Sequence, residues 1–372
     1  MRTSGRILLS DASGAATIEY DPTPAFRSRS ERKLPQGQLQ LRSEINTDEA
    51  GLAWRALNLN WLPVGLLGIV LSATIAWTDF SLEPITFAVV LAIAIVLTLA
   101  AYGSALIMPD AADPKLVFWF GTTAQILVVT AIVGPLSYFA NALNWPLQDQ
   151  ALLLIDRTMG LDPQSISAFF NDHSGLASYL NVGYGFIKWP LLGIPIILTM
   201  ALRFVRLQQF VLALNIALAV TIVISVFVPA VGTYYGLGLS PLERFPQLDS
   251  TNYAAQLRDI VALRAGSLRH LDLLRLTGIV SFPSFHTASA ILYVWAVWPV
   301  RAFRWAAIAL NGWMIAATPL IGAHYVIDLI GGVAVAAGSV LFAKHLFRYL
   351  MLESWRRKAS PVPGTCINRS SA

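Results

Sequence analysis

The stretch Ser281-Phe282-Pro283-Ser284-Phe285-His286-Thr287 stands directly before a long apolar run, and Gly322-Ala323-His324-Tyr325-Val326-Ile327-Asp328 stands before another. Each stretch places a histidine where a loop meets a candidate membrane helix. One bilayer crossing takes about 20 residues, so the chain between the histidines is about long enough to cross a bilayer twice. We therefore expect both histidines at one membrane face.

The composition is that of a membrane protein. Charged residues make up 13% of the chain and the mean hydropathy is +0.60, whereas a soluble domain carries about 25% charged residues. The apolar residues come in long runs, which is typical of spanning helices. The fold class is therefore predicted to be all-α, a polytopic membrane helix bundle. The net charge of +5 is expected to mark cytoplasmic loops and does not indicate nucleic-acid binding.

Eight runs are expected to span the membrane: residues 61–77, 85–108, 116–140, 179–202, 210–229, 285–300, 305–321 and 325–346. Residues 1–50 are polar and are expected to form a disordered cytoplasmic tail or a partner-binding tail. Residues 51–140 would hold the amino-terminal spans, 141–350 the catalytic membrane domain, and 351–372 a second cytoplasmic tail. The amino terminus lacks an apolar core of signal-peptide length, so no cleaved signal is expected.

Two segments between the spans have a different character. Residues 144–175 alternate short apolar groups with Asp, Arg and Asn, which predicts an interfacial or re-entrant helix. In residues 251–278, leucines and arginines alternate with approximately the period of a helix. This pattern predicts a helix that lies along the interface and has a basic face.

The basic loops predict the orientation. Arg203 and Arg206, Arg301 and Arg304, and the cluster after residue 343 fit cytoplasmic loops. Both termini would then be cytoplasmic, and the histidine loops would face the periplasm or exterior of an inner or plasma membrane. The arginines of 251–278 would also lie outside, so either they have a role there or the span count is wrong by one.

The second stretch carries the residues for nucleophilic chemistry. Asp328 lies four residues after His324, which is one turn along the same helix face. A carboxylate there can accept the imidazole N–H, fix the tautomer and stabilise the cation that forms when the other nitrogen attacks phosphorus. An aspartate within a spanning run is a functional candidate by default. His286 would protonate the leaving oxygen and later deprotonate the incoming water or hydroxyl.

The helix starts offer a place for an anion. Ser281 or Ser284 can cap the helix that carries His286, and Pro283 suits a helix start. Free backbone N–H groups at helix starts favour anions. Two converging starts therefore predict a phosphate-binding cradle.

Two other classes of function remain open at this point. The spans would allow a transporter or channel in which His324 and Asp328 form a proton relay, although paired broken helices in two matching halves are missing. A structural membrane protein that keeps an inactive site is the other alternative. A histidine at a membrane edge can also be a satisfied interfacial residue.

The motifs resemble those of a known family. Pro283-Ser284-Phe285-His286, followed by His324-Tyr325-Val326-Ile327-Asp328, resembles the second and third signature motifs of the type-2 phosphatidic acid phosphatase superfamily. Phe285 replaces that family's glycine, and Ala317 and Thr318 replace its Ser-Arg pair. These departures are similar to the branch of fungal inositol-phosphorylceramide synthases, and the segment 149–162 also looks like that branch.

The resemblance implies a six-helix phosphatase-like core and a metal-independent phosphatase or headgroup phosphotransferase without a cofactor. It implies His324 as the nucleophile that forms a phosphohistidine, His286 as the acid–base group and Asp328 as the partner of His324. The substrate would be a membrane lipid of the phosphatidic acid, isoprenyl diphosphate or phosphatidylinositol class. The oligomeric state stays open.

The family's first motif has no clean match in this chain. The candidates for binding phosphate are Ser284, Arg264, Arg269 and Arg275, with Lys188 as a further one. Tyr325 is expected to pack or to anchor at the interface, and Gly331 and Gly332 are expected to allow close helix contact. No metal is expected, because the other histidines lack ligand spacing and Cys366 is the only cysteine.

Overall fold

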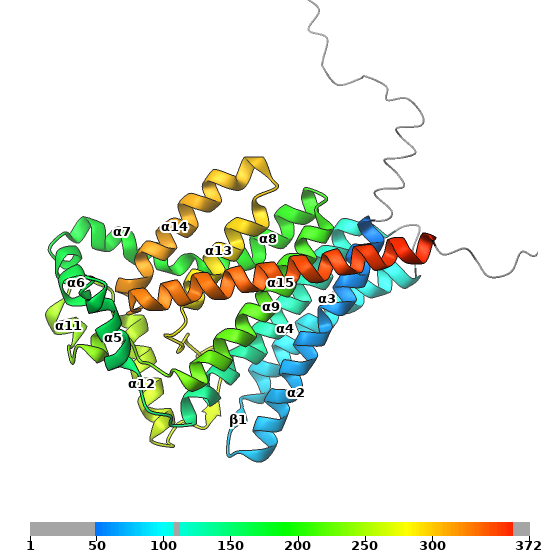
Figure 1. Ribbon diagram of the computed structural model, residues 1–372. Helices are drawn as coiled ribbons and strands as arrows, with labels where there is room; N and C mark the ends of the chain where they lie inside the picture. Colours follow the sequence, from blue (N-terminus) through cyan, green and yellow to red (C-terminus); the bar gives the residue numbers. More distant parts are fainter. Residues whose placement is uncertain (1–48, 108–111, 360–372) are drawn as a thin grey trace, which may run out of the picture. The chain divides into compact units, whose positions relative to one another are not determined.

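The computed structural model (Figure 1) describes residues 49–107 and 112–359 and is built of helices joined by short loops. The predicted tails, residues 1–50 and 351–372, lie mostly outside the described residues. Inside them, α15 continues to Ala359. The amino-terminal helices are α2 (Trp61–Trp77), α3 (Pro84–Ile107) and α4 (Pro114–Ala142).

The middle of the chain alternates short and long helices. These are α5 (Asp149–Thr158), α6 (Pro163–Asn171), α7 (Ser174–Tyr184), η1 (Gly185–Ile187), α8 (Lys188–Met200), α9 (Phe204–Phe227), α10 (Thr233–Gly236), α11 (Pro241–Arg244) and α12 (Thr251–Arg264). The carboxyl-terminal part holds α13 (Phe285–Val297), η2 (Arg301–Phe303), α14 (Arg304–Ile321) and α15 (Val326–Ala359). A short parallel pair joins β1 (Ser81–Leu82) to β2 (His270–Leu271).

The all-α membrane bundle is confirmed. Among the described residues, six helical stretches are long and apolar enough to span a membrane: Glu49–Trp77, Pro84–Ile107, Pro114–Ala142, Ser174–Met200, Phe204–Phe227 and Val326–Leu352. The runs expected as sixth and seventh spans form α13 and α14, and neither meets both criteria of length and hydropathy. At 1.5 Å per residue, the 13 residues of α13 reach only about 20 Å, short of a hydrocarbon core of about 30 Å. The part of the chain that the structure describes thus has six helices that meet both criteria, and α13 and α14 form a hairpin beside them.

The core lies between α4, α9, α13 and α15. In the span windows of α4 and α9, 56% of residues are buried, against 11% in α3. Figure 1 shows α2, α3, α4 and α9 side by side, with α15 crossing α9 and α13. Buried amides join the helices: Asn60 donates to Gln208, which donates to Thr122. Such polar contacts hold helices together in a bilayer, where apolar contact alone gives little specificity.

The predicted helix over 251–278 is wrong in its second half. α12 ends at Arg264, because Gly266 adopts φ +77°. The Ser267 N–H donates a hydrogen bond to the Ala262 carbonyl at 2.9 Å, and the Gly266 N–H donates one to the Leu263 carbonyl at 3.1 Å. This is the Schellman pattern that stops a helix at a glycine. The chain then forms β2 and a loop that leads to Ser281.

The start of α13 and helix α15 approach closely at a pair of glycines, as expected. A Cβ on Gly332 of α15 would lie 2.4 Å from the Ser284 carbonyl oxygen and 2.9 Å from the Thr287 Cβ. One on Gly331 would lie 3.0 Å from the Pro283 Cβ. The backbone that carries the first motif therefore rests directly on α15.

We expect Gly332→Ala to destabilise the protein by about 1–3 kcal/mol, because overpacking forces the two backbones apart. The matched control is Gly338→Ala on the same helix, where a Cβ meets nothing within 4 Å. That change should be neutral or slightly stabilising, since alanine suits a helix better than glycine. Thermal unfolding in detergent measures both variants, and equal melting temperatures would contradict the close contact.

Candidate functional site

His324 lies in the short loop between α14 and α15. The sequence predicts it in the first turn of a helix, but α15 begins at Val326, two residues later. Ala323 adopts φ +52°, which turns the chain before the helix. The predicted contact forms all the same: His324 Nδ1 lies 3.1 Å from Asp328 Oδ2, and both side chains are buried. The pairing therefore depends on the loop as well as on the helical spacing.

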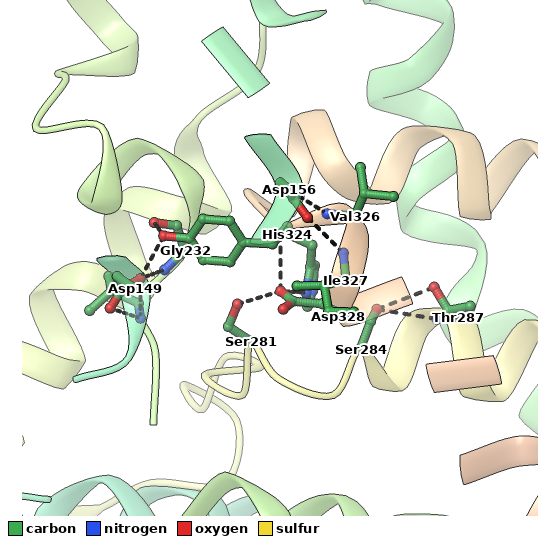
Figure 2. A network of polar contacts seen from close by, with 12 residues as sticks. Asp149, Asp156, Gly232, Ser281, Ser284, Thr287, His324, Val326, Ile327 and Asp328 are labelled. Atoms are coloured by element: carbon green, nitrogen blue, oxygen red, sulfur yellow. Dashed lines mark hydrogen bonds and ion pairs between the residues drawn. The ribbon is translucent and has the colours of Figure 1, made fainter. Parts of the chain in front are cut away.

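The Asp328 carboxylate accepts hydrogen bonds from two groups besides His324. Its Oδ2 also accepts from the Ser281 hydroxyl at 2.8 Å and from the Tyr325 N–H at 3.0 Å. Figure 2 shows Ser281 and His324 pointing to the same carboxylate. Oδ1 has no hydrogen-bond partner among the described residues. With Oδ2 accepting from Nδ1, the neutral His324 ring leaves Nε2 as its basic nitrogen.

The first motif is tied to the second through the backbone. The Ser284 N–H donates to the Asp328 carbonyl at 2.9 Å. The Ser284 hydroxyl accepts from the Thr287 N–H at 3.3 Å and so caps α13, as the sequence predicts. Ser284 is fully buried, and its described contacts are those of a cap. Its predicted role in phosphate binding stays a prediction.

The second histidine faces the first. His286 lies in the first turn of α13, and its ring centroid is 6.1 Å from that of His324, with the planes at 62°. The ring of Tyr184 stacks on His286 at 4.2 Å between centroids. The structure thus brings together the three residues predicted to be catalytic.

The Asp156 side chain of α5 accepts hydrogen bonds from the first backbone N–H groups of α15. Its two oxygens accept from the Val326 N–H at 2.7 Å and the Ile327 N–H at 2.9 Å, as Figure 2 shows. Burial raises the pKa of the Asp156 carboxyl, and the two N–H donors act in the opposite direction. The expectation that free N–H groups here form a phosphate cradle is therefore wrong for α15, because a carboxylate of the protein already binds these two.

A second aspartate of α5 holds Tyr325, the residue after His324. Asp149 accepts from the Gly232 N–H at 2.8 Å and from the Tyr325 hydroxyl at 3.0 Å. Burial raises the pKa of the Asp149 carboxyl, and these donors oppose the shift. Tyr325 is fully buried, so it packs in the interior and does not anchor at the interface. Asp149 and Asp156 together attach α5 to the three residues that follow His324.

Sequence reasoning missed the role of these two aspartates, although a signal was present. They stand seven residues apart in α5, which is about two turns along one helix face. The buried Leu152 and Leu153 lie between them. Acidic residues on the buried face of an amphipathic helix need partners inside the protein.

The predicted phosphate-clamping arginines have other partners. Arg264 donates to the Trp145 carbonyl at 2.8 Å, Arg269 pairs with Asp79 at 3.1 Å, and Arg275 pairs with Asp272 at 3.4 Å. Lys188 is exposed at the start of α8. None of these four is in hydrogen-bond or ion-pair contact with the two histidines or Asp328 in the described part of the chain. Their assignment as phosphate ligands stays a prediction.

The surroundings of His324 and the distribution of possible metal ligands complete the geometry of the site. Within residues 49–107 and 112–359, no group of three or more His, Cys, Asp or Glu side chains is arranged to hold a metal ion. A small cavity of about 10 Å³ lies beside His324, with Asp156 and Ser167 also in its wall. This is about the space that one water molecule needs.

We expect Asp156→Ala to lower activity by about 100-fold, because a displacement of His324 by about 1 Å costs that much. Loss of the cap should also cost about 0.5–2 kcal/mol of stability. The control is Asp162→Ala, which removes the cap of α6, where Asp162 accepts from the Ser165 N–H. Initial rates and melting temperatures are measured for both. An equal loss of activity in the control would contradict a specific role for Asp156.

The fold and site define an integral membrane protein with two facing histidines, one of them held by a buried aspartate. The sequence model of the PAP2 superfamily matches residues 150–342, which is more than half of the chain. The chain belongs to the PAP2 superfamily. No curated protein and no solved structure matches it.

Proposed function

We propose that this protein is a membrane phosphatase or phosphotransferase in which His324 attacks the phosphorus of a lipid phosphate. The observation that carries the proposal is the contact of 3.1 Å between His324 Nδ1 and Asp328 Oδ2, with His286 facing the same ring. Membership of the PAP2 superfamily supports phosphatase-type chemistry. It does not identify the substrate.

The geometry suits a two-step transfer. In the first step, His324 Nε2 forms a bond to phosphorus, the ester P–O bond breaks, and His286 gives its proton to the leaving oxygen. In the second step, His286 takes a proton from water or a lipid hydroxyl, the new O–P bond forms, and the N–P bond breaks. Centroids 6.1 Å apart leave room for a phosphate between the rings, since near-attack distances are about 3–3.5 Å.

Asp328 has a defined part in this scheme. Attack by Nε2 leaves the His324 ring positively charged. The buried carboxylate, already in contact with Nδ1, stabilises that charge without reorganising, which is the main way preorganised sites lower barriers. The scheme requires no metal ion, so rates should be unchanged by a chelator.

The acceptor decides between hydrolysis and transfer. The water-sized cavity beside His324 supports hydrolysis. Phe285 in the first motif and the segment around Asp156 resemble the inositol-phosphorylceramide synthase branch, which supports a lipid hydroxyl as acceptor. We propose that the reaction is the transfer of a phosphate-bearing headgroup between lipids, with hydrolysis as the alternative reaction.

We further propose that the site faces away from the cytoplasm. The Arg206 guanidinium lies 3.7 Å from the centroid of the Trp295 ring. The Arg304 guanidinium lies 5.2 Å from the centroid of the Trp298 ring. Lys344 also approaches Trp295. The basic loops therefore gather at the carboxyl-terminal end of α13, opposite the end that carries His286. Basic residues at one face mark the cytoplasmic side.

The test uses purified protein in detergent with a chelator present. Phosphatidic acid, isoprenyl diphosphate and phosphatidylinositol are each offered with and without an acceptor lipid. Released phosphate indicates a phosphatase, and a new phospholipid that depends on the acceptor indicates a transferase. No turnover of any of these lipids would overturn the proposal and favour the transporter reading.

A further inference from the structure

An apolar groove of about 210 Å³ lies between α8, α13 and α14. Its walls include Phe186, Trp189, Gly193, Tyr293, Ala307 and Asn311. Two polar groups of these walls bond to the backbone: the Tyr293 hydroxyl donates to the Ile187 carbonyl, and the Asn311 amide N–H donates to the Ala307 carbonyl. The groove therefore suits a hydrocarbon and offers little to a polar ligand.

Two elements run from the histidine site to the groove. Tyr293 lies seven residues after His286 on α13, about two turns along the same face and about 10 Å away. Tyr184, which stacks on His286, lies two residues before Phe186 of the groove wall. A lipid whose phosphate lies between the histidines could thus extend its chain into the groove.

The size of the groove and its position in the membrane indicate that it takes a single hydrocarbon chain. A dry cavity of about 150 Å³ holds one benzene ring, so the groove has room for a segment of one hydrocarbon chain and not for two packed side by side. α8 belongs to the membrane span Ser174–Met200, and Trp189 at the rim is 69% exposed. The groove is therefore within reach of lipid in the bilayer.

We propose that this groove binds one hydrocarbon chain of the substrate and sets the preference for chain length. The inference rests on the proposed function, since it assumes that the phosphate of the same lipid lies between His286 and His324. Burial of each methylene improves binding by about three- to fourfold. A long-chain lipid phosphate should accordingly be used with a much lower KM than a short-chain one.

Gly193 offers a way to fill the groove without disturbing the backbone, because a Cβ there meets nothing within 4 Å. We expect Gly193→Leu to lower kcat/KM for dioleoyl phosphatidic acid by at least about tenfold, mainly through KM, since the leucine displaces several methylenes. The same variant should change kcat/KM for dibutyryl phosphatidic acid by less than about twofold. Gly312→Leu is the control: it lies on α14 outside the groove wall and also has open space.

The outcomes separate the two proposals. Equal losses on both substrates, or no loss on either, would overturn the groove assignment while leaving the proposed function intact. If the wild type turns over neither substrate, the full set of lipids named above decides whether the proposed function fails, and crosslinking then tests the groove alone. A phosphatidic acid with a photoreactive group in its chain should label α8 and α14 in the wild type and less so in Gly193→Leu. Labelling spread evenly over the exposed helices would overturn the groove.

Discussion

Replacing His324 by alanine is expected to lower the rate of phosphate transfer by about 10⁴-fold or more. Removal of a nucleophile from a site that acts as a unit has effects of this order. In the scheme proposed here, His324 is the residue that forms the covalent intermediate. The measurement is the initial rate of phosphate release or lipid product formation, with the lipid that the wild type uses best.

The control for this change is His345→Ala. His345 lies in α15 like Asp328, but it is exposed and stands 17 residues beyond Asp328. This variant should keep wild-type activity. Because His324 is buried, the melting temperature of His324→Ala must be measured as well. Substantial activity in a folded His324→Ala protein would refute its role as the nucleophile.

Asp328→Asn is expected to lower kcat by about 10²- to 10⁴-fold while KM changes little. The substitution keeps the shape but removes the charge that stabilises the His324 cation, and the analogous change in a serine protease triad costs about 10⁴-fold. The amide NH₂ would also replace one carboxylate oxygen. At Oδ1 it would meet no partner among the described residues, and at Oδ2 it would oppose three donors.

A graded comparison distinguishes charge from geometry. Ser281→Ala removes one of the three donors to Asp328 but leaves the carboxylate and its contact with His324. Its activity should fall by about tenfold or less, because two donors to Oδ2 remain, a typical hydrogen bond contributes about 0.5–1.5 kcal/mol, and about 1.4 kcal/mol corresponds to tenfold. If Ser281→Ala and Asp328→Asn lose activity equally, the charge of Asp328 is not what matters.

The sequence supports the prediction of spans and of the catalytic pair for separate reasons. Long apolar runs predict helices because the bilayer requires internal hydrogen bonding. The spacing of His324 and Asp328 predicts their contact because four residues make about one turn. That contact formed even though His324 precedes α15, because Asp328 reaches back from the first turn of the helix to the loop.

Other parts of the site depend on contacts that spacing cannot show. Asp156 reaches Val326 across 170 residues of chain, and Asp149 reaches Tyr325 across 176. The end of α12 is set by one glycine that a leucine–arginine period conceals. The arginines placed by that period have partners in neighbouring segments, such as the Trp145 carbonyl for Arg264 and Asp79 for Arg269, and charge alone does not predict those partners.

The most direct test is to trap the covalent intermediate. The wild type is mixed with its lipid substrate carrying a radioactive phosphate, quenched in alkali, and digested for peptide mapping. We predict an acid-labile, alkali-stable phosphate on the peptide that contains His324, and none in His324→Ala. Label on any other residue, or none during measured turnover, would contradict a phosphohistidine at His324.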